Sequence, residues 1–131
     1  MAFQVTAYEH VGIRVTDRDA AREFYGKLGW REAIDLPEHH ANEMVNDAGI
    51  YINLIFNGVK RDRNILQDEP LKYPGVTHVA FVVKEFDDLL AMLDREGIPL
   101  SGGPYIYSDR RRVIFVRDPD RNVLEFNEVF A

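Results

Sequence analysis

Two short stretches of similar sequence decide the fold. His10-Val11-Gly12-Ile13-Arg14-Val15, near the start of the chain, is followed 68 residues later by His78-Val79-Ala80-Phe81-Val82-Val83. Every second residue of each stretch is a large apolar one, and this period of two is typical of a β-strand with one buried face. The histidine that begins each stretch belongs to the opposite face. A similarity at a fixed separation indicates two copies of one structural unit.

The sequence predicts a helix directly after each of these strands. Asp17 and Asp19 are candidate N-caps of the first helix, where an acidic side chain also suits the helix dipole. Gly29 and Gly97 stand where a left-handed C-terminal turn is expected. The predicted apolar stripes are Ala20, Ala21, Phe24, Tyr25 and Leu28 in the first helix and Phe86, Leu89, Leu90 and Leu93 in the second.

Three more strands are predicted in each copy, which gives the order βαβββ twice. We expect them at residues 30–36, 42–46 and 49–56 in the first copy and at 105–107, 112–117 and 122–129 in the second. The sequence thus predicts an α+β fold in one domain over residues 1–131. Module one spans about residues 5–57, a polar connector about 58–75, and module two about 76–130.

Composition excludes several classes of function. The chain has 131 residues, of which 46% are apolar and 29% charged, and it has no cysteine. It therefore has no disulfide framework and no thiolate chemistry. No apolar run reaches the roughly 18 residues of a membrane span, and the N-terminus does not look like a secretory signal, so we expect a cytoplasmic protein. A net charge of −6 argues against nucleic-acid binding.

Four chemically active side chains fall on matching positions of the two copies. His10 and His78 each precede the apolar residues of a first strand. Asn53 is the polar residue within an apolar last strand of module one, and Glu125 holds the corresponding place in module two. By the alternation of strand residues, all four lie on the face turned away from the helices. The repeat therefore predicts one shared polar site.

A carboxylate between Leu124 and Phe126 needs a partner, because an unpaired charge in an apolar sheet is costly. Two imidazoles and one carboxylate are a normal ligand set for a divalent transition metal, with positions left for substrate. Alternatively, Glu125 pairs with Arg112 or Arg14. His39-His40 is a competing histidine pair, although it is expected in a solvated turn.

The chain resembles the vicinal oxygen chelate superfamily, also called the glyoxalase/bleomycin-resistance/extradiol-dioxygenase family. The similarity extends from about Tyr8 to Val129. Its motifs are the repeated strands, Phe24-Tyr25-Gly26-Lys27-Leu28-Gly29-Trp30 at the end of the first helix, and Phe115-Val116-Arg117-Asp118-Pro119-Asp120 with Glu125.

This resemblance implies two βαβββ modules in a cupped, eight-stranded mixed sheet around one metal, with the helices on the outer face. It implies His10, His78 and Glu125 as ligands of one divalent transition metal (Fe, Mn, Ni, Co or Zn), with Asn53 at the fourth position. Glyoxalase I-like lyases usually carry Glu at the position of Asn53, which argues against ordinary glyoxalase I activity. Extradiol dioxygenases and fosfomycin-modifying transferases usually carry Tyr where this chain has Phe115.

The expected function is that of a mononuclear metalloenzyme acting on a small substrate through two adjacent oxygens, as a lyase, isomerase or ring-cleaving dioxygenase. Glu125 is both ligand and catalytic residue. The residues expected to bind substrate are Tyr51, Asn53, Tyr107 and Arg112, the last from the basic run Arg110-Arg111-Arg112. The alternative is a non-catalytic drug-sequestering protein of the bleomycin-resistance type. In either case we expect a homodimer with a small-molecule ligand, and no nucleic-acid or membrane partner.

Overall fold

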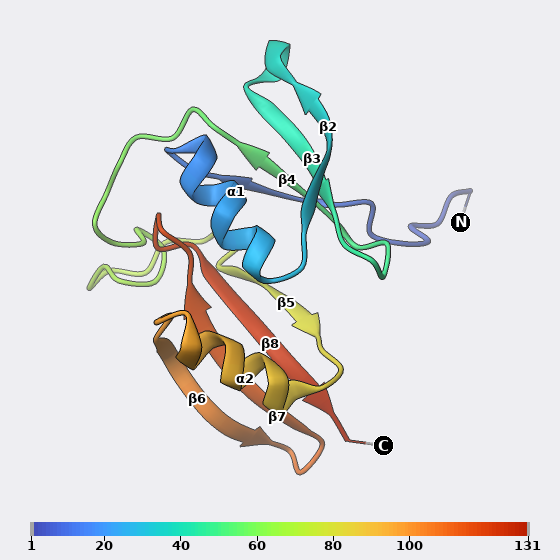
Figure 1. The fold of residues 1–131 in the computed structure, drawn as a ribbon, viewed down its shortest axis with the longest axis vertical. Coiled ribbons are helices and arrows are strands. Elements are labelled where there is room, and N and C mark those ends of the chain that lie inside the picture. Colours follow the sequence, from blue (N-terminus) through green and yellow to red (C-terminus); the bar gives the residue numbers. More distant parts are fainter. Residues whose placement is uncertain (1, 131) are drawn as a thin grey trace. The chain divides into compact units, whose positions relative to one another are not determined.

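A computed structural model describes residues 2–130 of the chain (Figure 1), and these divide into two compact units, unit 1 up to Lys60 and unit 2 from Arg61 onward. Each unit contains one strand, one helix and three further strands, so the predicted α+β class and the two βαβββ modules are confirmed. The boundary between the units lies inside the predicted connector. The organisation of both modules as one domain stays a prediction.

Unit 1 is a four-stranded mixed sheet with one helix. Strand β1 is parallel to β4, and β4 and β2 are both antiparallel to β3, which gives the order β1-β4-β3-β2. A short 3-10 helix, η1, forms where the sequence predicted a solvated turn at His39-His40. The elements are β1 Val11–Arg14, α1 Arg18–Lys27, β2 Arg31–Leu36, η1 Pro37–His39, β3 Ala41–Val45 and β4 Tyr51–Ile55.

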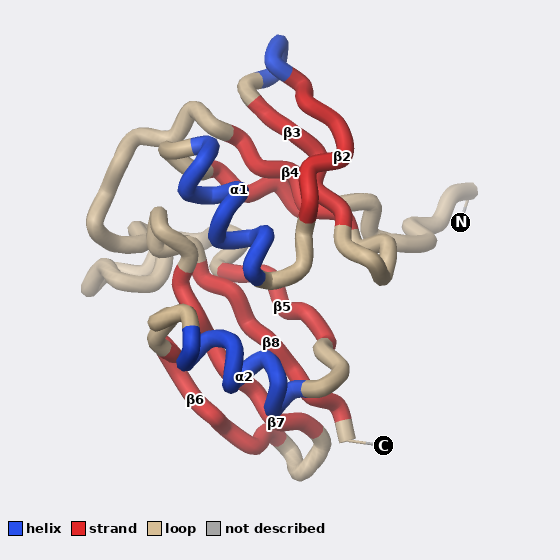
Figure 2. Tube along the Cα trace, in the orientation of Figure 1, coloured by secondary structure: helices blue, strands red, loops and turns tan. Residues whose placement is uncertain are grey.

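Unit 2 repeats this arrangement with longer strands (Figure 2). Strand β5 is parallel to β8, and the order is β5-β8-β7-β6. In both sheets the first strand lies at one edge and the strand after the helix lies at the other. The elements are β5 His78–Val82, α2 Phe86–Arg95, β6 Leu100–Tyr107, β7 Arg111–Arg117 and β8 Val123–Val129.

Local chemistry sets the start of α1 and the ends of both helices. The Asp17 carboxylate accepts a hydrogen bond from the Ala20 amide at 2.9 Å and is the N-cap of α1. Both helices end in a Schellman motif, with Gly29 at φ 105° and Gly97 at φ 69°. Such angles are costly for a residue with a Cβ atom, which explains the two glycines.

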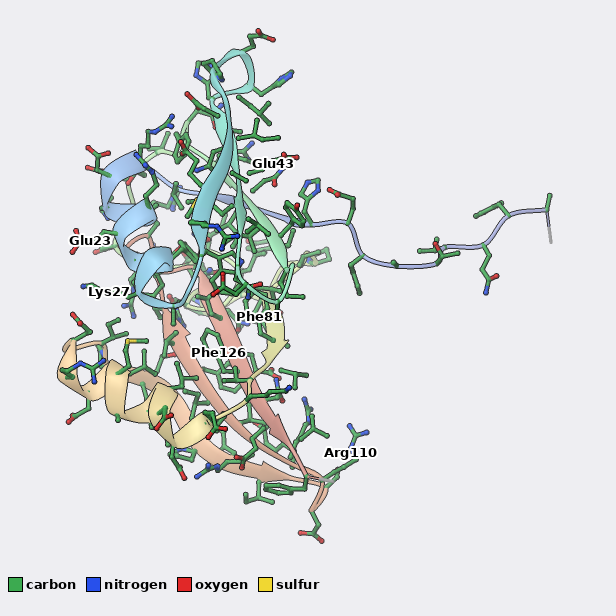
Figure 3. All side chains as sticks on the ribbon, turned by 45° about the vertical axis from the view of Figure 1, so that its right-hand side comes forward. Glu23, Lys27, Glu43, Phe81, Arg110 and Phe126 are labelled. Carbon is green, nitrogen blue, oxygen red and sulfur yellow. The ribbon has the colours of Figure 1, made fainter. Side chains whose placement is uncertain are left out.

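Each unit has its own apolar core on the helix side of its sheet. Ile52 and Leu54 of β4 are fully buried, as is Tyr25 of α1. In unit 2 the rings of Phe81 and Phe126 lie 5.7 Å apart on paired positions of β5 and β8 (Figure 3). Since alternate strand residues point to opposite faces, this packing turns the residues between them away from the helix.

The predicted strand over residues 105–107 is too short. Strand β6 begins at Leu100 and passes through Gly102 and Gly103, where its register against β7 shifts. Two glycines and a proline interrupt the alternation that the sequence prediction relied on, while the backbone pairing continues around them.

The connector is attached to unit 2 by an ion pair. Both carboxylate oxygens of Asp68 lie 2.9 Å from guanidinium nitrogens of Arg117 in β7. The Arg117 hydrogen bonds, with the backbone amide of Asn64, hold the pKa of Asp68 well below its ordinary value. Among the described residues, no helix is long and apolar enough to cross a membrane.

Candidate functional site

The strand registers of the two units show which residues correspond. Strand β1 pairs with β4 so that Gly12 is opposite Asn53, and β5 pairs with β8 so that Ala80 is opposite Glu125. Asn53 and Glu125 therefore hold equivalent places beside the first strand of their unit. His78 is the first residue of β5, and His10 immediately precedes β1. The sequence repeat thus corresponds to a structural one.

Within unit 2, the structure brings His78 and Glu125 together. The imidazole Nε2 of His78 lies 3.0 Å from Oε1 of Glu125. Glu125 is only 6% exposed, whereas His78 is open to solvent. On its other side, Nδ1 of His78 lies 2.8 Å from the Thr77 hydroxyl oxygen, and its ring meets Phe115 edge-on at 5.8 Å. The imidazole is therefore oriented by contacts on three sides.

The second carboxylate oxygen of Glu125 has separate partners. Asn127 donates to Oε2 from Nδ2 at 2.9 Å, and Arg111 approaches the same oxygen with Nη1 at 3.3 Å. Arg111 Nη1 also donates to Oδ1 of Asn127 at 2.7 Å. Burial of the Glu125 charge is thus offset by one cation and one amide. His78 contacts one oxygen of this carboxylate, and the Arg111–Asn127 pair contacts the other.

The adjacent arginines of β7 lie on opposite faces of the sheet. Arg112, which was expected to bind substrate, contacts α2: it pairs with Asp87 at 3.0 Å and stacks on the Phe86 ring. Burial lowers the pKa of Arg112, but the carboxylates of Asp87 and Glu128 outweigh this effect and raise the pKa overall. Arg111 lies on the same face as Glu125.

Tyr107, also expected to bind substrate, is on the Glu125 face as well. Its ring lies under the Arg111 guanidinium, 5.3 Å from ring centroid to Cζ, and stacks on Tyr105. Both tyrosines are more than a third exposed. The face of unit 2 that carries Glu125 therefore also carries an accessible aromatic pair beside a cation.

In unit 1, the equivalent face carries the other predicted residues. The Oδ1 atom of Asn53 is buried and has no hydrogen-bond partner among the described residues. Tyr51, two residues earlier on β4, is 40% exposed. His10 is partly exposed, with Nδ1 2.7 Å from the Glu9 carboxylate. A buried amide oxygen without a hydrogen-bond partner is costly, so a ligand that donates a hydrogen bond to Asn53 Oδ1 would remove this cost.

The chemistry of these donors fits a divalent metal, although the described residues do not form a complete site. Two ligand atoms at right angles on one metal, each about 2.1 Å from it, lie about 3 Å apart. His78 Nε2 and Glu125 Oε1 have this separation. Within residues 2–130, no group of three His, Cys, Asp or Glu side chains is placed to hold a metal. The predicted third ligand, His10, belongs to unit 1.

Sequence reasoning missed Arg111, Asn127 and Thr77 as partners of the histidine–carboxylate pair. Asn127 could have been found, because it lies two residues after Glu125 and shares its face. Arg111 could be identified only once the register of β7 was known. The competing pair His39-His40 lies at η1 and the left-handed residue after it, both exposed.

A shallow hollow lies away from the predicted site, within the connector. Its volume is about 680 Å³, and Ile65, Leu66, Leu71 and Tyr73 are among its lining residues. It contains no predicted site residue and few converging polar groups. Ligand sites combine an apolar wall with such groups, so the Glu125 face is the better candidate.

The comparison with models of known protein families gives one match. The model of the Glyoxalase/Bleomycin resistance protein/Dioxygenase superfamily matches residues 7–126. A glyoxalase/dioxygenase from Nostoc punctiforme is 20% identical with a TM-score of 0.74, each chain being covered completely. The protein SMU.1112c is 25% identical with a TM-score of 0.75, over 95% of this chain and all of the other.

A third similar structure is that of a variant of the fosfomycin resistance protein FosX from Listeria monocytogenes, in complex with Mn(II) and 1S,2S-dihydroxypropylphosphonic acid. It is 15% identical with a TM-score of 0.73, over 97% of this chain and 95% of the other. No curated protein matches the chain. At these identities, the solved structures support the fold.

Proposed function

Because the chain belongs to the Glyoxalase/Bleomycin resistance protein/Dioxygenase superfamily, we propose that it is a metal-dependent enzyme acting on two adjacent oxygens of a small molecule. The observation that carries this proposal is the contact between His78 and the buried Glu125 carboxylate, on positions that the repeat relates to His10 and Asn53. The FosX structure with Mn(II) supports a divalent metal as the cofactor.

In this proposal, His10, His78 and Glu125 hold one divalent transition metal. Bound there, the metal would attract two adjacent substrate oxygens and stabilise the negative charge that develops on one of them. Thr77 fixes the orientation of the His78 ring through Nδ1. Hydrogen bonds of this kind keep a ligating imidazole in one orientation and strengthen its binding.

Glu125 has a second role as the proton acceptor. Its Oε2 atom is held by Arg111 and Asn127, so Oε1, the oxygen that faces His78, would be the one that receives a proton from the substrate. Asn53 would accept a hydrogen bond from a substrate hydroxyl with its unpartnered Oδ1. The exposed phenols of Tyr51 and Tyr107 would orient the substrate. We propose that the protein works as a homodimer.

The experiment that tests this function combines metal loading with reaction type. Protein purified without a chelator is assayed with Fe(II) and oxygen on catechols, and with Ni(II), Co(II) or Zn(II) without oxygen on hemithioacetals and 2-oxo compounds. Turnover that requires Fe(II) and oxygen identifies a dioxygenase. Turnover without oxygen identifies a lyase or isomerase. Absence of metal-dependent turnover in every arm would contradict the proposal.

A second candidate function is metal-free binding of a small molecule. It is favoured by the fact that Glu125 is fully partnered by protein groups, with His78 at one oxygen and Arg111 and Asn127 at the other. A sequestering protein needs no metal. Wild-type protein that binds organic ligands equally well before and after treatment with a chelator would favour this candidate.

A further inference from the structure

The charges around Glu125 do not balance once that carboxylate serves as a metal ligand. Glu125 carries one negative charge, and Arg111 contacts it with one positive charge. A divalent metal on Oε1 would bring two more positive charges to the same carboxylate. The sum over the metal, Glu125 and Arg111 is then two positive charges, while the Glu9 carboxylate beside His10 is 78% exposed and screened by solvent. A substrate that binds the metal through a singly deprotonated oxygen pair cancels one of them and leaves the other.

We infer that Arg111 is a specificity-determining residue and that the substrate carries a carboxylate beside its two metal-binding oxygens. This inference rests on the proposed function. A monoanionic carboxylate matches the remaining charge. It is also the planar acceptor that a guanidinium binds through two parallel hydrogen bonds.

The geometry of Arg111 leaves room for such a contact. Within residues 2–130, every hydrogen bond and ion pair of its side chain runs through Nη1, so Nη2 and Nε keep donors to offer. The side chain is about a third exposed and reachable by a solute: its relative exposure is 32%. Stacking on Tyr107 holds the guanidinium plane in place, which limits the entropy lost when a ligand binds.

The neighbouring arginines do not have this arrangement and make matched controls. Arg112 is engaged by Asp87 and Glu128 on the helix side of the sheet. Arg110 is exposed and lies at the turn between β6 and β7 (Figure 3). Replacing any of the three by methionine removes one positive charge from the same run of sequence. If only one replacement changes ligand binding, the cause is the place of that arginine in the structure and not the loss of charge alone.

The test compares two chelating probes that differ in one carboxylate. Full-length protein loaded with Zn(II) is titrated calorimetrically, without oxygen, with 3,4-dihydroxybenzoate and with 4-methylcatechol. The wild type is expected to bind the benzoate about tenfold or more tightly. Arg111→Met should reduce this ratio to about one, Arg111→Lys should retain part of it, and Arg110→Met and Arg112→Met should keep the wild-type ratio.

Three results would overturn the inference. The ratio survives in Arg111→Met, or it disappears in Arg112→Met, or the wild type shows no preference although both probes bind. If Arg111→Met does not fold, Arg111→Lys and Arg111→Gln carry the comparison, because both keep a long polar side chain beside Asn127. Zinc-loaded protein that binds neither probe would contradict the proposed function and the inference together.

Discussion

His78 Nε2 lies 3.0 Å from Oε1 of Glu125, across 47 residues of sequence and between two parallel neighbouring strands. Strand β5 fixes the position of the histidine in the sheet, and β8 fixes the position of the carboxylate. Since Glu125 is almost fully buried and its other oxygen is held by Arg111 and Asn127, its position is fixed by the sheet. The pair is therefore organised before any ligand arrives.

We expect Asn53→Leu to stabilise the metal-free protein. The amide oxygen of Asn53 is buried without a partner, and leucine has the same branched shape with no polar atom to satisfy. The free energy of unfolding should rise by about 1 kcal/mol in urea titrations. The same variant should bind 4-methylcatechol more weakly when loaded with Zn(II). A loss of stability would show that the oxygen is satisfied in solution.

Asn42→Ala should have the opposite effect on stability. Asn42 is fully buried, donates to Glu32 at 2.8 Å and accepts from the Leu54 amide at 3.1 Å. Its removal leaves the buried Leu54 amide without a partner and takes one donor from Glu32, which keeps its contact with Arg18, and should cost roughly 1–3 kcal/mol by urea unfolding. Asn57→Ala, at an exposed position, is the control and should change stability by less than about 0.5 kcal/mol.

Asp68 makes stability depend on pH. The Arg117 hydrogen bonds, with the Asn64 amide, lower the pKa of Asp68 in the folded protein. Its contribution is therefore complete above the unfolded pKa of about 3.9 and is lost as the pH falls toward the lower folded value. Asp68→Asn should cost up to about 1 kcal/mol at pH 7, because solvent screens this exposed ion pair.

Urea unfolding of wild type and Asp68→Asn at pH 7, 5 and 3 checks this sign. The difference between the two proteins should be equal at pH 7 and 5 and smaller at pH 3. A difference that grows on acidification would contradict the assigned pKa direction.

Two glycines near the C-terminal end of α1, one inside the helix and one after it, should respond to alanine in opposite directions. Gly29 has φ 105°, a left-handed conformation in which a Cβ atom costs about 1–2 kcal/mol. Gly26 lies inside the helix, with nothing within 4 Å of an added Cβ, so alanine there should stabilise by about 1 kcal/mol. Thermal unfolding of both variants measures the contrast. Equal effects would refute the C-terminal turn.

Much of the fold was predictable because the spacing of apolar residues and the internal repeat indicate the same strands and helices. The strands beginning near His10 and His78, both helices and both glycine turns follow from local pattern. The full length of β6 did not, because its backbone pairing continues through Gly102 and Gly103, where side-chain alternation gives no signal.

The site was predictable only where it depends on strand parity, the alternation of residues between the two faces of a strand. Parity places His78 and Glu125 on one face, and the structure puts them in contact. It could not show that Arg111, and not the predicted Arg112, shares the face of Glu125, because that depends on which face of β7 meets α2. It gave no sign of the Thr77 contact, which depends on the conformation of the residue before the strand.

The most direct test of the central claim is the metal content of the protein. Wild type, His10→Ala, His78→Ala and Glu125→Ala are purified without chelator, equilibrated with Mn(II) or Zn(II), and analysed by mass spectrometry for metal per chain. His39→Ala, at an exposed turn, is the control. We predict about one metal per chain in the wild type and the control, and a large loss in the other three. Wild type that takes up no metal, or variants that keep it, would contradict the claim.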